Sequence, residues 1–221
     1  MNVKKLKRSI AVIFVLIGLV ILQHMVLLAD MRNSLTALLI NIAALIFTCI
    51  YFVQLSRNLR DFLFISRIKY KAYMIAASYC ITYLSIAWIT FDIKNPYYPT
   101  AVDKGIRVLL VLIALATFIN QLVQYCILGY RLVKNAGFPF VKELGLTFLY
   151  AIPFMFVCTV IFLLFKPLKG FSHVFIIIEL LPYWFTYQIY QALIAKQLPE
   201  TQDLIVTNAA VIPGEEQNIA G

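Results

Sequence analysis

The chain has 221 residues, of which 62% are hydrophobic and only 13% are charged. A soluble domain is about one-quarter charged and rarely exposes large apolar patches, so this composition excludes an ordinary soluble fold and indicates a membrane protein. The net charge of +9 does not indicate a nucleic-acid partner, because basic residues beside membrane spans are expected from topology alone.

Six long apolar segments predict an all-α, polytopic membrane protein built as a bundle of six transmembrane helices. A bilayer core of about 30 Å needs roughly 20 apolar residues at 1.5 Å each. Backbone groups in lipid need internal hydrogen bonds, which a helix supplies. The predicted spans cover residues 9–29, 34–54, 70–91, 106–129, 144–165 and 171–195. The first run exceeds the apolar core of a signal peptide, so we interpret it as an uncleaved span.

The distribution of Lys and Arg predicts which side of the membrane each loop occupies. With the N-terminus inside, the inner segments carry about twice as many of the 19 Lys and Arg residues as the outer loops do. Because these residues accumulate in cytoplasmic loops, we expect both termini to be cytoplasmic, in the plasma membrane. The short connections at residues 30–33 and 166–170 predict two antiparallel hairpins, one at each end of the chain.

The first predicted inner loop, residues 55–71, has the pattern of a short amphipathic helix. Its apolar residues recur at helical spacing, whereas Arg57 and Arg60 fall elsewhere on the helical wheel. Such a helix is typical of the membrane interface. Two roles remain open for it, which are anchoring to anionic lipid and docking a cytoplasmic protein.

Hydropathy falls sharply after the last span, at Lys196. Residues 197–221 contain two prolines and four acidic residues, a composition that buries little apolar surface. We therefore predict a mostly disordered cytoplasmic tail.

The motifs of common enzymes and cofactor sites are absent from the sequence. Its four cysteines, Cys49, Cys80, Cys126 and Cys158, fall in different apolar segments and form no CxxC pair. There is no HExxH, no GxSG and no glycine-rich phosphate loop. No catalytic residue, cofactor or metal is therefore predicted, and the chain is not expected to be an enzyme.

The last span carries an acidic residue, Glu179, in its interior. A charge in hydrocarbon costs a few kcal/mol or more, so such residues usually face a bundle interior or a cavity. Three residues of other spans lie at a similar depth and could donate a hydrogen bond to it, namely His24, Asn41 and Tyr83.

Polar residues also line one face of the last span. Tyr183, Thr186 and Tyr190 follow Glu179 at intervals of four, three and four residues, so the four share a helix face. In the inner half of the fourth span, Asn120, Gln121 and Gln124 add amide groups. These residues, with His24, Asn41 and Tyr83, form a candidate polar path, although Asn, Gln and Tyr also commonly bond membrane helices to each other.

Two functions follow from these features. The first is transport, by a small permease or a membrane subunit of a transporter with a polar path along the last span. The alternative is a non-catalytic membrane sensor, immunity factor or assembly partner that docks another protein through residues 55–71 and the C-terminal tail. The expected partners are the lipid bilayer and either a second protein or further copies of this chain.

Overall fold

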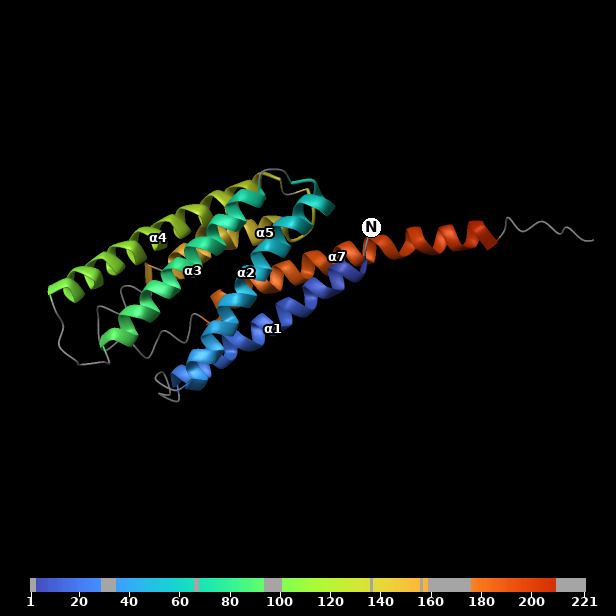
Figure 1. Ribbon diagram of the computed structural model, residues 1–221. Helices are drawn as coiled ribbons and strands as arrows, with labels where there is room; N and C mark the ends of the chain where they lie inside the picture. The colour runs from blue at the N-terminus through green and yellow to red at the C-terminus, as the bar shows by residue number, and fades with distance from the viewer. Residues whose placement is uncertain are drawn as a thin grey trace, which may run out of the picture.

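A computed structural model describes residues 3–28, 35–65, 68–93, 101–135, 137–155, 157–158 and 176–209 (Figure 1). Within these ranges every regular element is a helix, so the all-α class is confirmed. The helices are α1 (Val3–Leu28), α2 (Leu35–Leu63), α3 (Ile68–Ile93), α4 (Ala101–Lys134), α5 (Val141–Leu146), the π-helix η1 (Thr147–Ala151) and α7 (Ile176–Ala209).

Three stretches of these helices are long and apolar enough to cross a bilayer. They are Val3–Val26 in α1, Thr36–Leu63 in α2 and Lys104–Lys134 in α4. Each of the other three predicted spans, 70–91, 144–165 and 171–195, includes residues whose side chains lie outside the described part of the chain. The membrane class is therefore supported, and the count of six spans stays a prediction.

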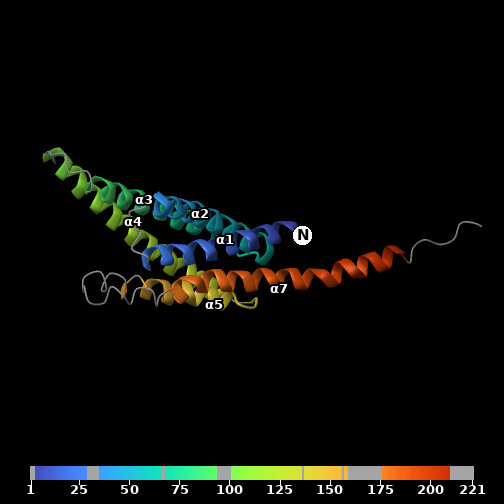
Figure 2. The ribbon, with the colours of Figure 1, turned by 90° about the horizontal axis from the view of Figure 1, so that it is seen from below.

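The helices pack as a closed ring. Each of α1 to α4 packs against the next, α4 packs against α5 and η1, and α7 returns to pack against both α5 and α1. Figure 2 shows α5 and α7 side by side below α1, α2 and α3. Because the ring closes, one face of every element points to a shared interior.

One end of the ring collects most of the basic residues. The start of α1, the corner between α2 and α3, and the turn between α4 and α5 lie together there (Figure 1). We call it the basic end. Its described cationic residues include Lys4, Lys5, Lys7, Arg8, Arg57, Arg60, Lys69, Lys71, Arg131, Lys134 and Lys142.

Residues 55–63 are the last two turns of α2, and this corrects the prediction of a separate interfacial helix. Leu55 and Leu59, expected to face lipid, are buried in the protein core. An apolar stripe at helical spacing is the same whether it packs on lipid or on a neighbouring helix, so the sequence could not distinguish the two.

Polar contacts join α1 to α2 at the basic end. Asn58 Nδ2 donates to Ser9 Oγ at 3.0 Å, and Lys5 Nζ lies 2.9 Å from Asp61 Oδ2.

Two glycines bring the backbones of α4 and of the segment from α5 into η1 close together. A Cβ on Gly129 would lie 2.6 Å from Gly145 O and from Leu149 N, and a Cβ on Gly145 would lie 2.8 Å from Val133 N. Small residues permit such contact between membrane helices. The π-helix η1 follows α5 directly, and Pro153 lies two residues beyond the end of η1.

Helix α7 continues past the predicted end of the last span. It runs through Pro182 and on to Ala209, projecting beyond the rest of the molecule in Figures 1 and 2. The tail predicted from residue 197 thus begins as helix, because extending an existing helix costs far less than nucleating one. Residues 210–221 lie outside the described residues.

Two cysteines that are far apart in the sequence meet between α2 and α3. The sulfur atoms of Cys49 and Cys80 are 3.2 Å apart. This pair could not be predicted from the sequence, because the two residues lie in different segments with no motif between them.

Substitution of Gly129 or Gly145 by Ala is expected to destabilise the protein by about 1–3 kcal/mol, because the added methyl would overlap backbone atoms of the facing helix. Gly18→Ala is the matched control, since a Cβ there meets nothing within 4 Å. Unfolding of purified protein in a detergent titration measures the effect. Equal stability of Gly129→Ala and Gly18→Ala would contradict this packing.

Mild oxidation of membranes is expected to join Cys49 to Cys80, because their sulfur atoms already lie near bonding distance. Mass spectrometry of non-reduced peptides would detect the linked pair, and Cys49→Ser would remove it. A chain that instead linked Cys49 to Cys126 would refute the packing of α2 on α3.

Candidate functional site: a cavity around Glu179

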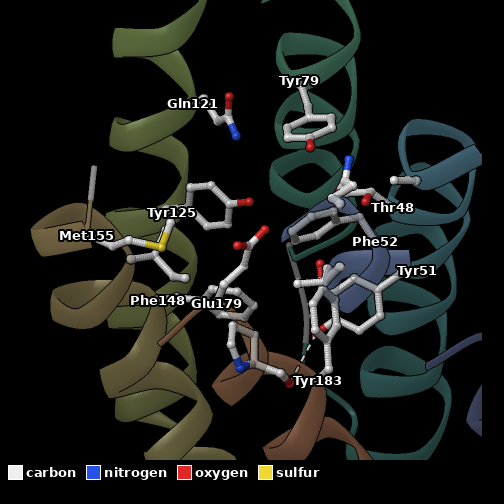
Figure 3. A pocket seen from close by; sticks show the side chains of 15 residues that line it. Thr48, Tyr51, Phe52, Tyr79, Gln121, Tyr125, Phe148, Met155, Glu179 and Tyr183 are labelled. Atoms are coloured by element: carbon white, nitrogen blue, oxygen red, sulfur yellow. Dashed lines mark hydrogen bonds between the residues drawn. The ribbon is translucent and has the colours of Figure 1, made fainter. Parts of the chain in front are cut away.

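A cavity of about 150 Å³ lies inside the ring (Figure 3). Every side of the ring contributes to its wall. The lining residues are Val20, Gln23, Ala44, Thr48, Tyr51, Phe52, Tyr79, Gln121, Tyr125, Phe148, Ile152, Met155, Glu179, Pro182 and Tyr183. Glu179 therefore lines an internal cavity.

Glu179 enters this cavity from the first turn of α7. In Figure 3 its carboxylate points into the space between Tyr125 of α4 and Phe52 of α2. Its side chain is 35% exposed, so the carboxylate is only partly covered by protein. This placement satisfies the physical requirement that a charge among apolar helices needs a partner or water.

The partner of Glu179 is His24 of α1. His24 Nε2 lies 3.1 Å from Glu179 Oε2. Among the three donors expected at this depth, the structure thus brings His24 to the carboxylate. The contact is an ion pair when the imidazole is protonated and a hydrogen bond from Nε2–H when it is neutral. It also links α1 to α7, the two helices that close the ring.

Aromatic rings form the inner wall of the cavity. Tyr51 meets Tyr183 edge to face, with ring centroids 5.0 Å apart. Tyr125 stacks on Phe148 at 5.5 Å, and Phe52 contacts Tyr125 at 5.8 Å. Such pairs are stabilising beyond the area they bury, so this wall is rigid compared with one of flexible aliphatic chains.

Hydrogen bonds seal the α7 face just below the cavity. The hydroxyls of Tyr51 and Thr186 are 2.8 Å apart, and Thr186 Oγ1 donates to Pro182 O at 2.7 Å. Thr186 and Tyr190 are completely covered, with exposures of 0% and 1%. The predicted stripe on α7 therefore divides, with Glu179 and Tyr183 at the cavity and Thr186 and Tyr190 in the packed core.

Gln121 brings an amide group to the cavity wall. Its side chain is 2% exposed and lies four residues before Tyr125, which lines the same wall. A buried polar group left without a hydrogen-bond partner costs about 1–3 kcal/mol. The cavity beside Gln121 can hold water that bonds to such groups.

The other predicted polar residues do not line the cavity. Asn41 accepts a hydrogen bond from Gln23 Nε2 at 2.8 Å. Asn120 Nδ2 donates to Ser78 Oγ at 2.7 Å, and Gln124 Nε2 donates to Asn120 at 3.2 Å. Tyr83 is half-buried on α3 and is not part of the cavity wall.

Several cavity residues were missed from the sequence. Tyr51, Tyr79, Tyr125 and Thr48 contribute polar atoms from three helices. One usable signal was spacing, because Tyr125 lies four residues after Gln121 and therefore on the same helix face.

The arrangement places the Glu179 carboxylate, whose Oε2 contacts His24, and the Gln121 amide at one cavity. The cavity can hold water or a small polar species beside the Glu179 carboxylate. In the described segments no group of three His, Cys, Asp or Glu side chains could hold a metal ion. No protein-family model, curated protein or solved structure matches this chain.

Proposed function

We propose that the chain is a small permease, or a membrane subunit of a transporter, whose pathway passes through the cavity around Glu179. The observation that carries this proposal is that Glu179, which is paired with His24, lines a cavity to which α1, α2, α3, α4 and α7 all contribute. An ionisable residue inside a membrane bundle is costly to keep unless it serves a purpose such as proton or solute passage. Packing alone would be served as well by an amide.

The cavity volume limits what could pass. Pockets for drug-sized ligands occupy roughly 300–1,000 Å³, whereas about 150 Å³ holds several water molecules at about 30 Å³ each. The favoured cargo is therefore a proton, a small ion or a small polar solute.

Protonation of the pair would drive the transport cycle. With Glu179 ionised and His24 protonated, the pair is neutral overall and the two helices are drawn together. A proton arriving at Glu179 removes its charge and leaves His24⁺ without its counter-ion, which favours separation of α1 from α7. The sealed contact between Tyr51 and Thr186 would have to open for a solute to continue toward the basic end.

Six spans with both termini in the cytoplasm, in the plasma membrane, complete this proposal. The gathering of Lys and Arg at one end of the ring supports it, because cytoplasmic ends of membrane helices are enriched in these residues. Under this orientation Glu179 lies in the half of the bundle that faces away from the cytoplasm.

A second candidate is a non-catalytic sensor, immunity factor or assembly partner. The projection of α7 beyond the bundle favours it, because a helix that extends into solvent offers a surface to another protein. Here the ring would be a membrane anchor and the cavity a consequence of imperfect packing.

Replacing Glu179 with Gln is expected to reduce proton flux into liposomes to the level of protein-free vesicles, because Gln has a similar shape but cannot bind the proton. A pH-sensitive dye inside the vesicles measures the flux under an imposed potential. Glu143→Gln on α5 is the matched control, because Glu143 is exposed and does not line the cavity. Unchanged flux in Glu179→Gln, with the protein folded, would refute the transport proposal.

The second candidate predicts the opposite sensitivities. Truncation after residue 196 combined with Arg57→Gln and Arg60→Gln should abolish recovery of a bound protein after gentle detergent extraction, because both docking segments are lost. Glu179→Gln should leave that recovery unchanged. Mass spectrometry of the co-purified material from the full chain and each variant makes the comparison, and loss in Glu179→Gln alone would argue against a docking role.

A further inference from the structure

A second cavity lies at the basic end, between the last turns of α2 and the first turns of α3. Its volume is about 130 Å³, and it is lined by Ser56, Arg57, Arg60, Lys69 and Tyr73. Three of these five side chains are cationic, and none of the described residues that line the cavity is acidic. Like charges around one small space repel each other, so the pocket favours an anion. It shares no lining residue with the cavity around Glu179.

The neighbouring acid does not neutralise this pocket. Asp61 Oδ1 accepts hydrogen bonds from Arg60 Nε at 3.0 Å and from Arg60 Nη2 at 2.9 Å. Its other oxygen accepts from Lys5 Nζ at 2.9 Å. One carboxylate is thus shared by two cations. The contact fixes the Arg60 guanidinium in place, while the charges of Arg57 and Lys69 are left without an acidic counterpart in the lining.

The surroundings of the pocket have the composition of a membrane interface. Phe64, at the corner between α2 and α3, has a positive φ of 54° and is 86% exposed. A positive φ is uncommon for a bulky residue, and here it accompanies an outward-facing ring beside a buried Ile65. Tyr70 is also exposed, with Lys71 Nζ 5.4 Å from its ring centroid. Exposed aromatic and basic side chains together mark the depth of the lipid headgroups.

The size of the pocket fits a single phosphate group. About 130 Å³ corresponds to roughly four water-sized groups, which matches the four oxygen atoms of a phosphate. Guanidinium groups donate two parallel hydrogen bonds to phosphate oxygens, and an ammonium adds a compact charge. Basic pockets between helices at the cytoplasmic side are suited to anionic headgroups.

We propose that this pocket binds the phosphate of an anionic phospholipid headgroup. Arg57 holds the phosphate from α2 with its paired guanidinium donors, and Lys69 holds it from α3. Arg60, whose Nε and Nη2 are bound to Asp61, contributes only its remaining Nη donors. The lipid thereby joins the two helices at the corner where Asp61 already joins α2 to α1. This lipid site shares no lining residue with the cavity around Glu179, so its variants leave the residues of that cavity unchanged.

Native mass spectrometry of the full-length protein, titrated with phosphatidic acid or phosphatidylcholine, tests the proposal. One phosphatidic acid should bind about tenfold more tightly than phosphatidylcholine. Arg57→Gln combined with Lys69→Gln should abolish this preference. Lys71→Gln combined with Lys134→Gln removes the same charge from the basic end outside the pocket, and should leave the preference within about twofold.

The same titration contains the outcomes that would overturn the proposal. If Lys71→Gln combined with Lys134→Gln lowered the preference for phosphatidic acid as much as the pocket variant does, the binding would reflect general charge and no specific pocket. Displacement of phosphatidic acid by millimolar inorganic phosphate would assign the pocket to a soluble anion. Equal binding of both lipids by the unmodified chain would refute the site without recourse to any variant. Arg57→Lys, which keeps the charge but loses the paired donors, should give an intermediate preference if the pocket holds phosphate.

Discussion

The pairing of Glu179 with His24 across α1 and α7 is the constraint around which the rest of the ring is arranged. A carboxylate among apolar helices needs both a counter-group and some access to water, and here each need is met by a different feature. The imidazole of α1 supplies the counter-group, and the cavity supplies the room for water. Because the two residues are 155 positions apart in the sequence, the same contact holds the first helix to the last.

The packing around the ring is uneven. On the side of α4 and α5, glycines bring the backbones into direct contact. On the sides of α2 and α7, large tyrosines hold the helices apart and hydrogen-bond across the gap. Because the helices are close together on one side and farther apart on another, a cavity is left between them. Polar side chains line this cavity.

The sequence was sufficient to predict the features that depend on local pattern. Apolar runs predicted that the described helices exist, and counting residues from the middle of each span placed His24 at the depth of Glu179. What the sequence could not provide was the choice of neighbour. Periodicity identifies the apolar face of residues 55–63 without saying whether lipid or α1 covers it. Likewise, Tyr51 and Tyr125 belong to the cavity because of which helices adjoin α7, and that depends on contacts distant in the sequence.

The π-helix η1 sets the rotational phase of the wall that follows it. A π-turn accommodates one residue more than an α-turn, so everything after Ala151 is rotated by about 100° relative to an uninterrupted α-helix. Ile152 and Met155 face the cavity with this phase (Figure 3). Were the turn to tighten to α geometry, these two side chains would swing away and their neighbours would replace them. A single residue of helical register thus determines which side chains the cavity presents on that side, without any substitution in the chain.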